Sequence, residues 1–272
     1  MNTDALRDKA NDVRIDIVKM LAEAGSGHPG GSLSAADIMC ALYFGDVLKH
    51  DPSNPHDPAR DRFVLSKGHA APVLYAVLAE AGYFEKERLA TLRKYGSSLQ
   101  GHPDCRKLPG VDASTGSLGQ GLSIASGMAC GLKMDGSDSH VFALLGDGEC
   151  QEGQVWEAAM FAAHRKLDNL IAIVDHNHLQ IDGKIEEVCS PESLIAKFDA
   201  FGWSVCTCDG NDMDDVLATL LSAKFSQADA PRVIVAETIK GKGVSFMEGQ
   251  ASWHGKAPDV TQATRALEEL GA

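Results

Sequence analysis

The strongest constraint on the fold of this chain is a pair of short, continuous apolar runs that each end in a polar turn. Residues 141–145 (Val-Phe-Ala-Leu-Leu) lead into Gly-Asp-Gly at 146–148, and residues 170–174 (Leu-Ile-Ala-Ile-Val) lead into Asp-His-Asn at 175–177. Such runs are typical of strands buried on both faces of a parallel sheet. Because a helical pattern over 155–165 lies between them, the region is predicted to be a βαβ unit with a right-handed crossover.

The same alternation extends over the rest of the chain and predicts an α/β fold. Residues 25–31, rich in glycine, are expected to exclude a helix, and residues 96–119 are expected to form loop. The other expected elements are helices at 4–24, 35–48, 71–81, 121–133, 213–225 and 259–271, and strands at 203–206 and 233–236. We therefore expect a single domain over 1–272, with a central, mostly parallel sheet flanked by helices on both faces.

Composition excludes several other classes of protein. The formal charge of −13, from 25 basic and 38 acidic residues, argues against a nucleic-acid binder, which needs a basic surface. A hydrophobic content of 44% excludes a disordered chain. No apolar run reaches the roughly 20 residues of a membrane span, the N-terminus has no signal-peptide pattern, and seven cysteines without CxxC spacing favour free thiols. A cytoplasmic protein with neither nucleic acid nor membrane as partner is predicted.

Two polar side chains follow the two predicted strands directly. Asp147 and Asn177 should lie at the same sheet edge, where the carboxyl ends of parallel strands meet and ligands bind. A carboxylate and an amide oxygen suit Mg²⁺, and the backbone carbonyl of Leu179 could add a third oxygen. Gly148 leaves room for a phosphate near backbone N–H groups. The alternative is that both turns are ordinary turns, but a buried strand before each favours the metal site.

Five ordered motifs give this chain a resemblance to the transketolase family over nearly its whole length. The central one is Gly-Asp-Gly-Glu-Cys-Gln-Glu-Gly at 146–153, continuing to Asp-His-Asn at 175–177, which resembles the thiamine diphosphate motif of transketolases. The others are 26–30 (Ser-Gly-His-Pro-Gly), 65–70 (Leu-Ser-Lys-Gly-His-Ala), 101–103 (Gly-His-Pro) with 115–121 (Thr-Gly-Ser-Leu-Gly-Gln-Gly), and 252–255 (Ser-Trp-His-Gly).

The resemblance implies a thiamine diphosphate site with Mg²⁺, or another divalent cation such as Ca²⁺ or Mn²⁺. It implies that the metal ligands are Asp147, Asn177 and the Leu179 carbonyl, and that Glu152 orders the loop. The other cofactor-binding residues that it implies are Gly146, Gly148, His69 and His254 around the diphosphate, Gly116, Ser117, Leu118 and His102 around the aminopyrimidine, and Ile181 at the thiazolium. His28, His69 and His254 are expected to be the catalytic residues, hydrogen-bonding the substrate hydroxyls or the developing oxyanion.

Several other chemistry-bearing residues are expected to have structural roles. His176 and His178 are interpreted as loop residues, because alternate residues of an extended segment point to opposite faces and could not chelate together. The pair Cys206 and Cys208 is expected to pack, and the acids at 212–215 to stabilise a helix N-terminus. Residues 240–243 (Lys-Gly-Lys-Gly) leave two interpretations open, a solvated turn or a role near the cofactor.

The resemblance also implies that part of the active site lies on another chain. In the family, the glutamate that activates the cofactor belongs to a pyrimidine-binding domain, and that domain and the arginines that hold the substrate phosphate have no counterpart here. We expect a separate C-terminal subunit, an α₂β₂ assembly, and contacts through residues 121–133 and 39–44, although ordinary internal packing explains these two segments equally well.

The expected activity is transfer of a two-carbon ketol unit from a ketose phosphate to an aldose, with the particular sugars left open. The alternatives are the α subunit of another thiamine enzyme, such as a 2-oxoacid dehydrogenase, and a non-catalytic cofactor-binding module.

Overall fold

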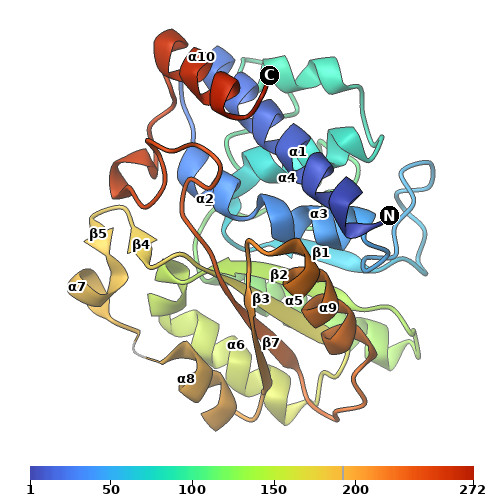
Figure 1. The fold of residues 1–272 in the computed structure, drawn as a ribbon. Helices are drawn as coiled ribbons and strands as arrows, with labels where there is room; N and C mark the ends of the chain where they lie inside the picture. The colour runs from blue at the N-terminus through green and yellow to red at the C-terminus, as the bar shows by residue number, and fades with distance from the viewer. Residues whose placement is uncertain (192) are drawn as a thin grey trace.

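The computed structural model describes residues 1–191 and 193–272, and a parallel sheet of five strands lies at its centre (Figure 1). The strand order is β1-β2-β3-β7-β6, and every neighbouring pair is parallel. The strands are β1 (Arg62–Leu65), β2 (Val141–Gly146), β3 (Leu170–His176), β6 (Ser204–Asp209) and β7 (Arg232–Glu237). All five carboxyl ends therefore point to one edge, the edge at which a doubly wound fold binds its ligands.

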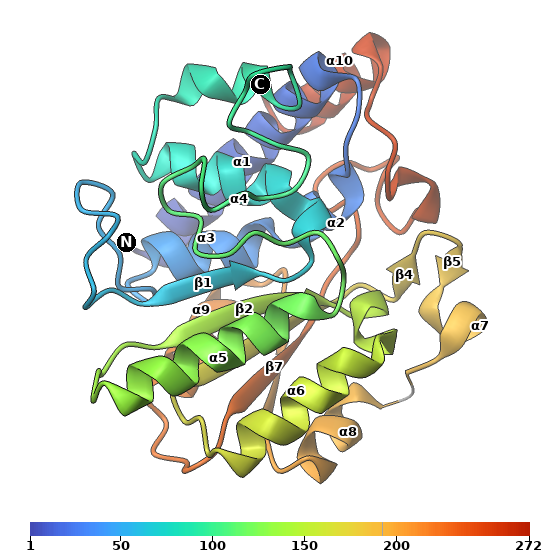
Figure 2. The same cartoon turned by 180° about the vertical axis from the view of Figure 1, so that it is seen from behind.

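Helices cover both faces of the sheet, as Figures 1 and 2 show from opposite sides. One face carries α1 (Thr3–Ala24), α3 (Ala36–Phe44), α4 (Ala71–Glu80) and α9 (Met213–Phe225), with α10 (Val260–Glu269) packed on α1. The other carries α5 (Gln120–Met134), α6 (Gly153–His164) and α8 (Leu194–Ala200). Leu144 packs into the first core and Leu145 into the second, because successive strand residues point to opposite faces.

Short elements occupy the loops between these layers. They are α2 (Pro29–Ser34), η1 (Gly68–Ala70), η2 (Lys86–Thr91), η3 (Gly148–Gln151), the hairpin of β4 (Leu179–Gln180) and β5 (Gly183–Lys184), α7 (Ile185–Cys189) and η4 (Ala251–Trp253). Five of them, α2, η1, η3, β4 and η4, carry or adjoin residues of the predicted site. Residues 92–119 form turns and loop, which includes the loop predicted over 96–119.

The predicted strands of the sheet are confirmed. One prediction near them, that the glycine-rich run excludes a helix, is wrong, and strand β1 was missed. The two apolar runs are neighbouring parallel strands, and the helix over 213–225 has the predicted bounds. However, α2 begins inside the glycine-rich run, because Pro29 occupies the first helical turn, where its missing N–H costs nothing. Strand β1 was not predicted, since four residues among polar neighbours give little periodicity.

The two segments proposed as subunit contacts differ in exposure. Met39, Cys40 and Leu42 of α3 are fully buried inside the core, so internal packing is the correct explanation for that segment. In α5, by contrast, Ile124 is partly exposed and added side-chain atoms at Gly127 and Gly131 would meet open space.

The seven cysteines are all free, and no helix in the described ranges is long and apolar enough to cross a membrane.

Candidate functional site

The structure brings the predicted metal ligands together at the carboxyl ends of β2 and β3. Asp147 is 2% exposed, and its two carboxylate oxygens accept hydrogen bonds from the backbone N–H groups of Gly148 at 2.7 Å and His178 at 2.5 Å. Asn177 is also buried, and its side-chain oxygen accepts the N–H of Leu179 at 3.2 Å. A carboxylate, an amide oxygen and the Leu179 carbonyl thus surround one turn, which is the oxygen donor set that Mg²⁺ prefers.

A lysine from a distant segment completes this group. The ammonium of Lys240 donates to the carbonyl oxygen of Leu179 at 2.9 Å and lies 3.1 Å from Nδ1 of His254. Lys240 is 2% exposed, and burial together with the charge of Lys67 lowers its pKa to about 8. Of the two interpretations left open for residues 240–243, a solvated turn is wrong for Lys240, which lies buried beside Leu179 and His254.

Beneath the predicted metal ligands lies a fully buried ion pair that the sequence did not reveal. Lys67 donates to Asp175 and, at 2.9 Å, to the carbonyl of Gly31. The hydroxyls of Ser34 and Thr238 also donate to Asp175. Burial alone would raise the pKa of Asp175, but Lys67 and the hydroxyl donors hold it below its usual value. This pair ties together α2, the end of β1, β3 and β7.

The three histidines predicted to be catalytic form one cluster. The ring centroids of His28 and His69 are 5.4 Å apart, those of His28 and His254 are also 5.4 Å apart, and those of His69 and His254 are 5.0 Å apart. They come from the start of α2, from η1 and from the residue after η4, so three motifs distant in sequence meet here. Nδ1 of His28 is buried without a hydrogen-bond partner among residues 1–191 and 193–272. Such an orphaned atom is expected where a ligand binds.

All three imidazoles are kept neutral by their surroundings. Burial, with nearby Arg93, lowers the pKa of His28 to about 4, and burial with nearby Lys240 lowers the pKa of His254 to about 3. Burial and Lys67 hold the pKa of His69 well below its usual value. At neutral pH each ring can therefore donate one hydrogen bond and accept another, while Lys240 supplies the positive charge.

His102 packs directly over the predicted aminopyrimidine turn. Gly116 has φ of 141°, and a Cβ at this position would lie 2.8 Å from Cγ of His102, so only glycine fits. The same turn touches η1, since a Cβ on Gly68 would lie 2.6 Å from the backbone nitrogen of Gly116. Ser117 and Leu118 remain exposed beside it. The fourth predicted histidine thus borders the same region as the other three.

The acid that orders the central loop in the structure is Glu149. Its carboxylate accepts the Ser66 hydroxyl at 2.5 Å and the N–H groups of Gly119 and Gly146 at 2.9 and 3.0 Å. Burial raises its pKa despite these three donors. Glu152, to which the resemblance also assigns a role in ordering the loop, is exposed at the N-cap of α6 without a side-chain capping bond, and its role stays a prediction. No feature of the sequence distinguished Glu149 from Glu152, because the partners of Glu149 come from three separate segments.

Ile181 lies in the turn between β4 and β5, and its side chain is 68% exposed and free to contact a ligand. The hairpin packs against the metal turn, since a Cβ on Gly148 would lie 3.2 Å from that of Gln180.

The expectation that His176 and His178 point to opposite faces is wrong, because their ring centroids are only 4.0 Å apart. The reason is that His178 adopts φ of 62°, so the segment is not extended at this residue.

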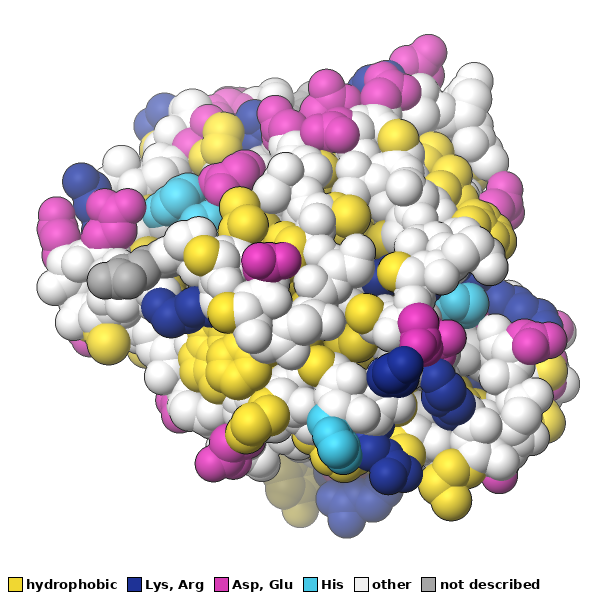
Figure 3. All heavy atoms as spheres, turned by 90° about the horizontal axis from the view of Figure 1, so that it is seen from below, with side chains coloured by type: hydrophobic (Ala, Val, Ile, Leu, Met, Phe, Trp, Pro, Cys, Tyr) yellow, Lys and Arg dark blue, Asp and Glu magenta, His cyan; other side chains and the backbone are white. Residues whose placement is uncertain are grey.

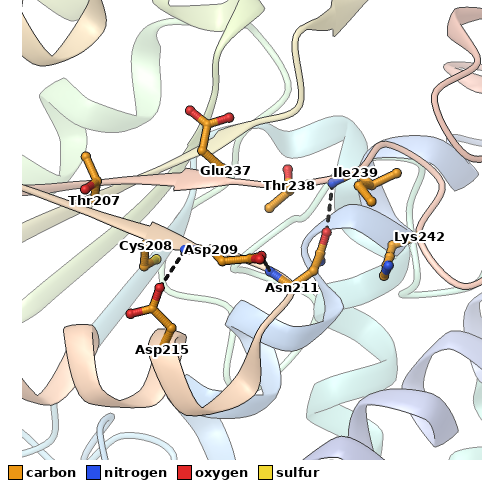
Figure 4. Close-up of a pocket in the computed structure, with 9 residues that line it drawn as sticks. All are labelled: Thr207, Cys208, Asp209, Asn211, Asp215, Glu237, Thr238, Ile239 and Lys242. Carbon is orange, nitrogen blue, oxygen red and sulfur yellow. Dashed lines mark hydrogen bonds between the residues drawn. The ribbon is translucent and has the colours of Figure 1, made fainter.

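A cavity of about 530 Å³ lies beside this region, at the ends of β6 and β7 (Figure 4). None of the predicted site residues lines it. Its lining residues are Thr207, Cys208, Asp209, Asn211, Asp215, Glu237, Thr238, Ile239 and Lys242. Figure 4 shows the Glu237 carboxylate pointing away from Asn211 and Asp215.

Comparison with known proteins gives matches to transketolases by family model, by sequence and by structure. The family model described as "Transketolase, thiamine diphosphate binding domain" matches residues 6–271. The chain is 48% identical over 249 residues to a 6-deoxy-6-sulfo-D-fructose transketolase subunit from Clostridium sp. (strain MSTE9), covering 92% of this chain and 90% of that protein. It is 42% identical over 270 residues to an apulose-4-phosphate transketolase subunit from Phocaeicola vulgatus, covering 99% and 95%.

Single-chain transketolases match over only part of their length. The human enzyme is 43% identical over 267 residues, which are 98% of this chain but 42% of the enzyme. The crystal structure of transketolase from Campylobacter jejuni superposes with a TM-score of 0.92 and 36% identity, covering all of this chain and 43% of that one. The chain belongs to the transketolase family and corresponds to its N-terminal, thiamine diphosphate-binding domain.

Proposed function

We propose that this chain is the cofactor-binding subunit of a two-subunit transketolase that transfers a two-carbon ketol unit from a ketose to an aldose. The observation that carries the proposal is the difference in coverage. The chain spans 90% and 95% of two relatives named as subunits, but 42% of the human single-chain enzyme. A second polypeptide then supplies the pyrimidine-binding domain, with the activating acid and the groups that hold the substrate phosphate.

The residues present fit the implied cofactor. Asp147, Asn177 and the Leu179 carbonyl offer three oxygens to Mg²⁺, or to Ca²⁺ or Mn²⁺, and a diphosphate supplies further oxygens to such an ion. Lys240, whose ammonium donates to the Leu179 carbonyl, would add a positive charge beside a bound diphosphate. His69 and His254 add neutral N–H donors. The backbone near Gly116 and Leu118 is proposed to contact the aminopyrimidine, and Ile181 the thiazolium.

When bound, thiamine diphosphate supplies the carbanion that attacks the ketose carbonyl. The tasks of this chain are to orient the cofactor and to manage protons around it. The neutral cluster of His28, His69 and His254 can hydrogen-bond the sugar hydroxyls and stabilise negative charge that develops on the carbonyl oxygen. The buried Nδ1 of His28 without a partner is a ready acceptor or donor for this purpose.

The outer face of α5 and α6 is proposed to contact the partner subunit. Ile124 on α5 and Met160 and Phe161 on α6 are 36%, 58% and 44% exposed. Figure 3 views the molecule from the side of α6 and α8 and shows hydrophobic side chains at the surface among charged ones. Leu118, just before α5 and 37% exposed, connects this face to the cofactor residues. An α₂β₂ assembly would place these residues at a subunit interface and complete each active site there.

The substrate class is proposed from the same family of subunits. Two relatives are named for 6-deoxy-6-sulfo-D-fructose and apulose-4-phosphate, both sugars with an anionic group. A panel of phosphorylated and sulfonated ketoses, with several aldose acceptors, tests this part. A cytoplasmic location is proposed because seven free thiols are typical of a protein in a reducing compartment.

The proposal is tested by reconstitution. The chain is assayed for ketol transfer with thiamine diphosphate and Mg²⁺, alone and with the candidate partner, and calorimetry measures cofactor binding. Activity only in the mixture, lost in Asp147→Ala and retained in the matched variant Asp209→Asn at the neighbouring strand end, supports it. Full activity of the chain alone would refute the two-subunit arrangement. Failure of the mixture to bind the cofactor in a Mg²⁺-dependent way would refute the function.

A further inference from the structure

The carboxyl ends of β3 and β7 carry a second group of ligand-type side chains, which none of the roles above uses. His176 and Glu237 are the last residues of their strands and are paired across the sheet. Residues paired in this way project from the same face. His178 joins them because its positive φ folds the chain back after Asn177. Ligand atoms of all three side chains lie within 4.8 Å of one another.

The distances within this group are close to those around a metal ion. Nε2 of His178 lies 2.8 Å from one carboxylate oxygen of Glu237, and Nε2 of His176 lies 3.7 Å from the other. Zinc bonds of about 2.0–2.2 Å separate neighbouring tetrahedral ligands by roughly 3.3–3.5 Å. Small side-chain rotations would therefore bring the three groups to coordinating positions without moving the strands.

The neighbouring carboxylate prepares His176 for this role. Nδ1 of His176 lies 3.2 Å from the Asp147 carboxylate, which leaves Nε2 directed toward Glu237. Metal-binding histidines commonly have this arrangement, in which a carboxylate holds one ring nitrogen and the metal takes the other.

We propose that His176, His178 and Glu237 bind a divalent transition-metal ion such as Zn²⁺. Two imidazoles and one carboxylate favour Zn²⁺ and its neighbours in the transition series over Mg²⁺, which prefers the all-oxygen set of Asp147, Asn177 and Leu179. The side chains of His178 and Glu237 are 48% and 55% exposed, so an ion can enter from solvent and keep water in its open positions.

The bound ion would affect the turn that carries the cofactor residues. His176 and the backbone N–H of His178 both contact Asp147, and Asn177 lies between them. An ion held by His176, His178 and Glu237 would fasten this turn to the end of β7. The structure thus assigns the site a positioning effect on the Mg²⁺ ligands, transmitted through Asp147.

The test is direct metal binding to the full chain, in complex with its partner subunit where the two copurify. Isothermal titration with Zn²⁺ is carried out in excess Mg²⁺, and Co²⁺ absorption identifies the ligand type. The expected result is one ion per chain with a nitrogen and oxygen spectrum, without thiolate charge-transfer bands. Removing a ligand in His178→Ala or Glu237→Gln should weaken binding by at least about 100-fold, and Asp147→Asn by about 10–100-fold.

Two controls make the result specific. His164→Ala removes an exposed histidine on α6, and Cys105→Ser with Cys189→Ser removes the two exposed thiols; binding should be unchanged in both. Melting curves establish that each variant is folded, and Zn²⁺ should raise the melting temperature of the wild type but not of His178→Ala. Absence of Zn²⁺ binding, or binding of equal affinity in His178→Ala and Glu237→Gln, overturns the inference. Both outcomes are read from Zn²⁺ binding and melting rather than from ketol transfer, so failure of this inference leaves the proposed function to its own test.

Discussion

Two neighbouring pairs of strand ends place acidic side chains at the same edge of the sheet, with opposite results. At the ends of β2 and β3, Asp147 and Asp175 are buried, and every charge has donors from other segments. At the end of β6, Asp209 is exposed beside a cavity of about 530 Å³, and so is Asp215 in the first turn of the following helix, α9. A carboxylate after a strand is therefore not enough to mark a site. The distinguishing feature is burial together with convergent donors.

The difference between the buried and the exposed strand ends is one of free energy. Burying a charge is costly unless it is paired and hydrogen-bonded. Four charged side chains are buried at the first edge: Lys67, Glu149, Asp175 and Lys240. Their contacts hold polar groups in fixed positions before any ligand arrives. Binding an ion and a diphosphate requires such preorganisation. The acids at the second pair of strand ends remain in water and carry no such cost.

The largest effect is expected from Asp175→Ala. It leaves the fully buried Lys67 without its counter-ion and should lower the free energy of unfolding by about 3–5 kcal/mol. Asp209→Asn at the exposed end should change it by less than about 0.5 kcal/mol. Chemical denaturation measures both.

The double variant Asp175→Ala with Lys67→Met sharpens this result. It removes both charges, so it should be more stable than Asp175→Ala alone. Equal effects of Asp175→Ala and Asp209→Asn would contradict the distinction between the two edges.

Glu149→Gln should have the next largest effect. The amide of glutamine can satisfy only some of the three donors, from Ser66, Gly119 and Gly146, that now converge on the carboxylate. One buried donor left unpaired costs about 1–3 kcal/mol. Asp215→Asn, whose carboxylate accepts the N–H of Asp209 at 2.8 Å on the exposed side, is the matched control and should be nearly neutral. Similar losses for both variants would show that convergence of donors is not what matters.

The buried histidine cluster predicts that the free energy of unfolding depends on pH, through groups at the buried edge. The pKa of His254 is about 3 in the folded chain against 6.5 when unperturbed. As pH falls below 6.5, the unfolded chain takes up a proton that the folded chain refuses, so stability is lost progressively down to the folded pKa. His254→Gln removes this contribution, and its unfolding free energy should fall less steeply than that of the wild type between pH 6.5 and 4.

The exposed His164 provides the control for that measurement. His164→Gln changes an exposed side chain at the end of α6, so it should leave the slope of stability against pH unchanged. If His254→Gln and the wild type had parallel curves, the ring of His254 would not be desolvated as the structure describes.

Sequence reasoning succeeded where the information is local or periodic. The position of Asp147 and Asn177 at one edge of the sheet was predicted from the strands before them, and the helices of the two layers from their apolar spacing. It failed for Glu149, whose partners lie in three segments, and for the pairing of Lys67 with Asp175, which are 108 residues apart. It also failed for His178, where one backbone angle reverses the direction of a side chain. These features depend on tertiary contacts and have no periodic signature.

The smallest effect is expected at Asn211, a half-buried side chain beside the exposed acids. The Asn211 amide donates to Asp37 at 2.9 Å and accepts the N–H of Ile239 at 2.8 Å (Figure 4), so it links the end of β6 to α3 and to the residues after β7. Asn211→Ala should cost about 0.5–1.5 kcal/mol for each hydrogen bond that water does not replace. Denaturation of this variant beside Asp209→Asn measures it. A loss as large as that of Asp175→Ala would mean that the second edge is also preorganised, and the comparison between the two edges would fail.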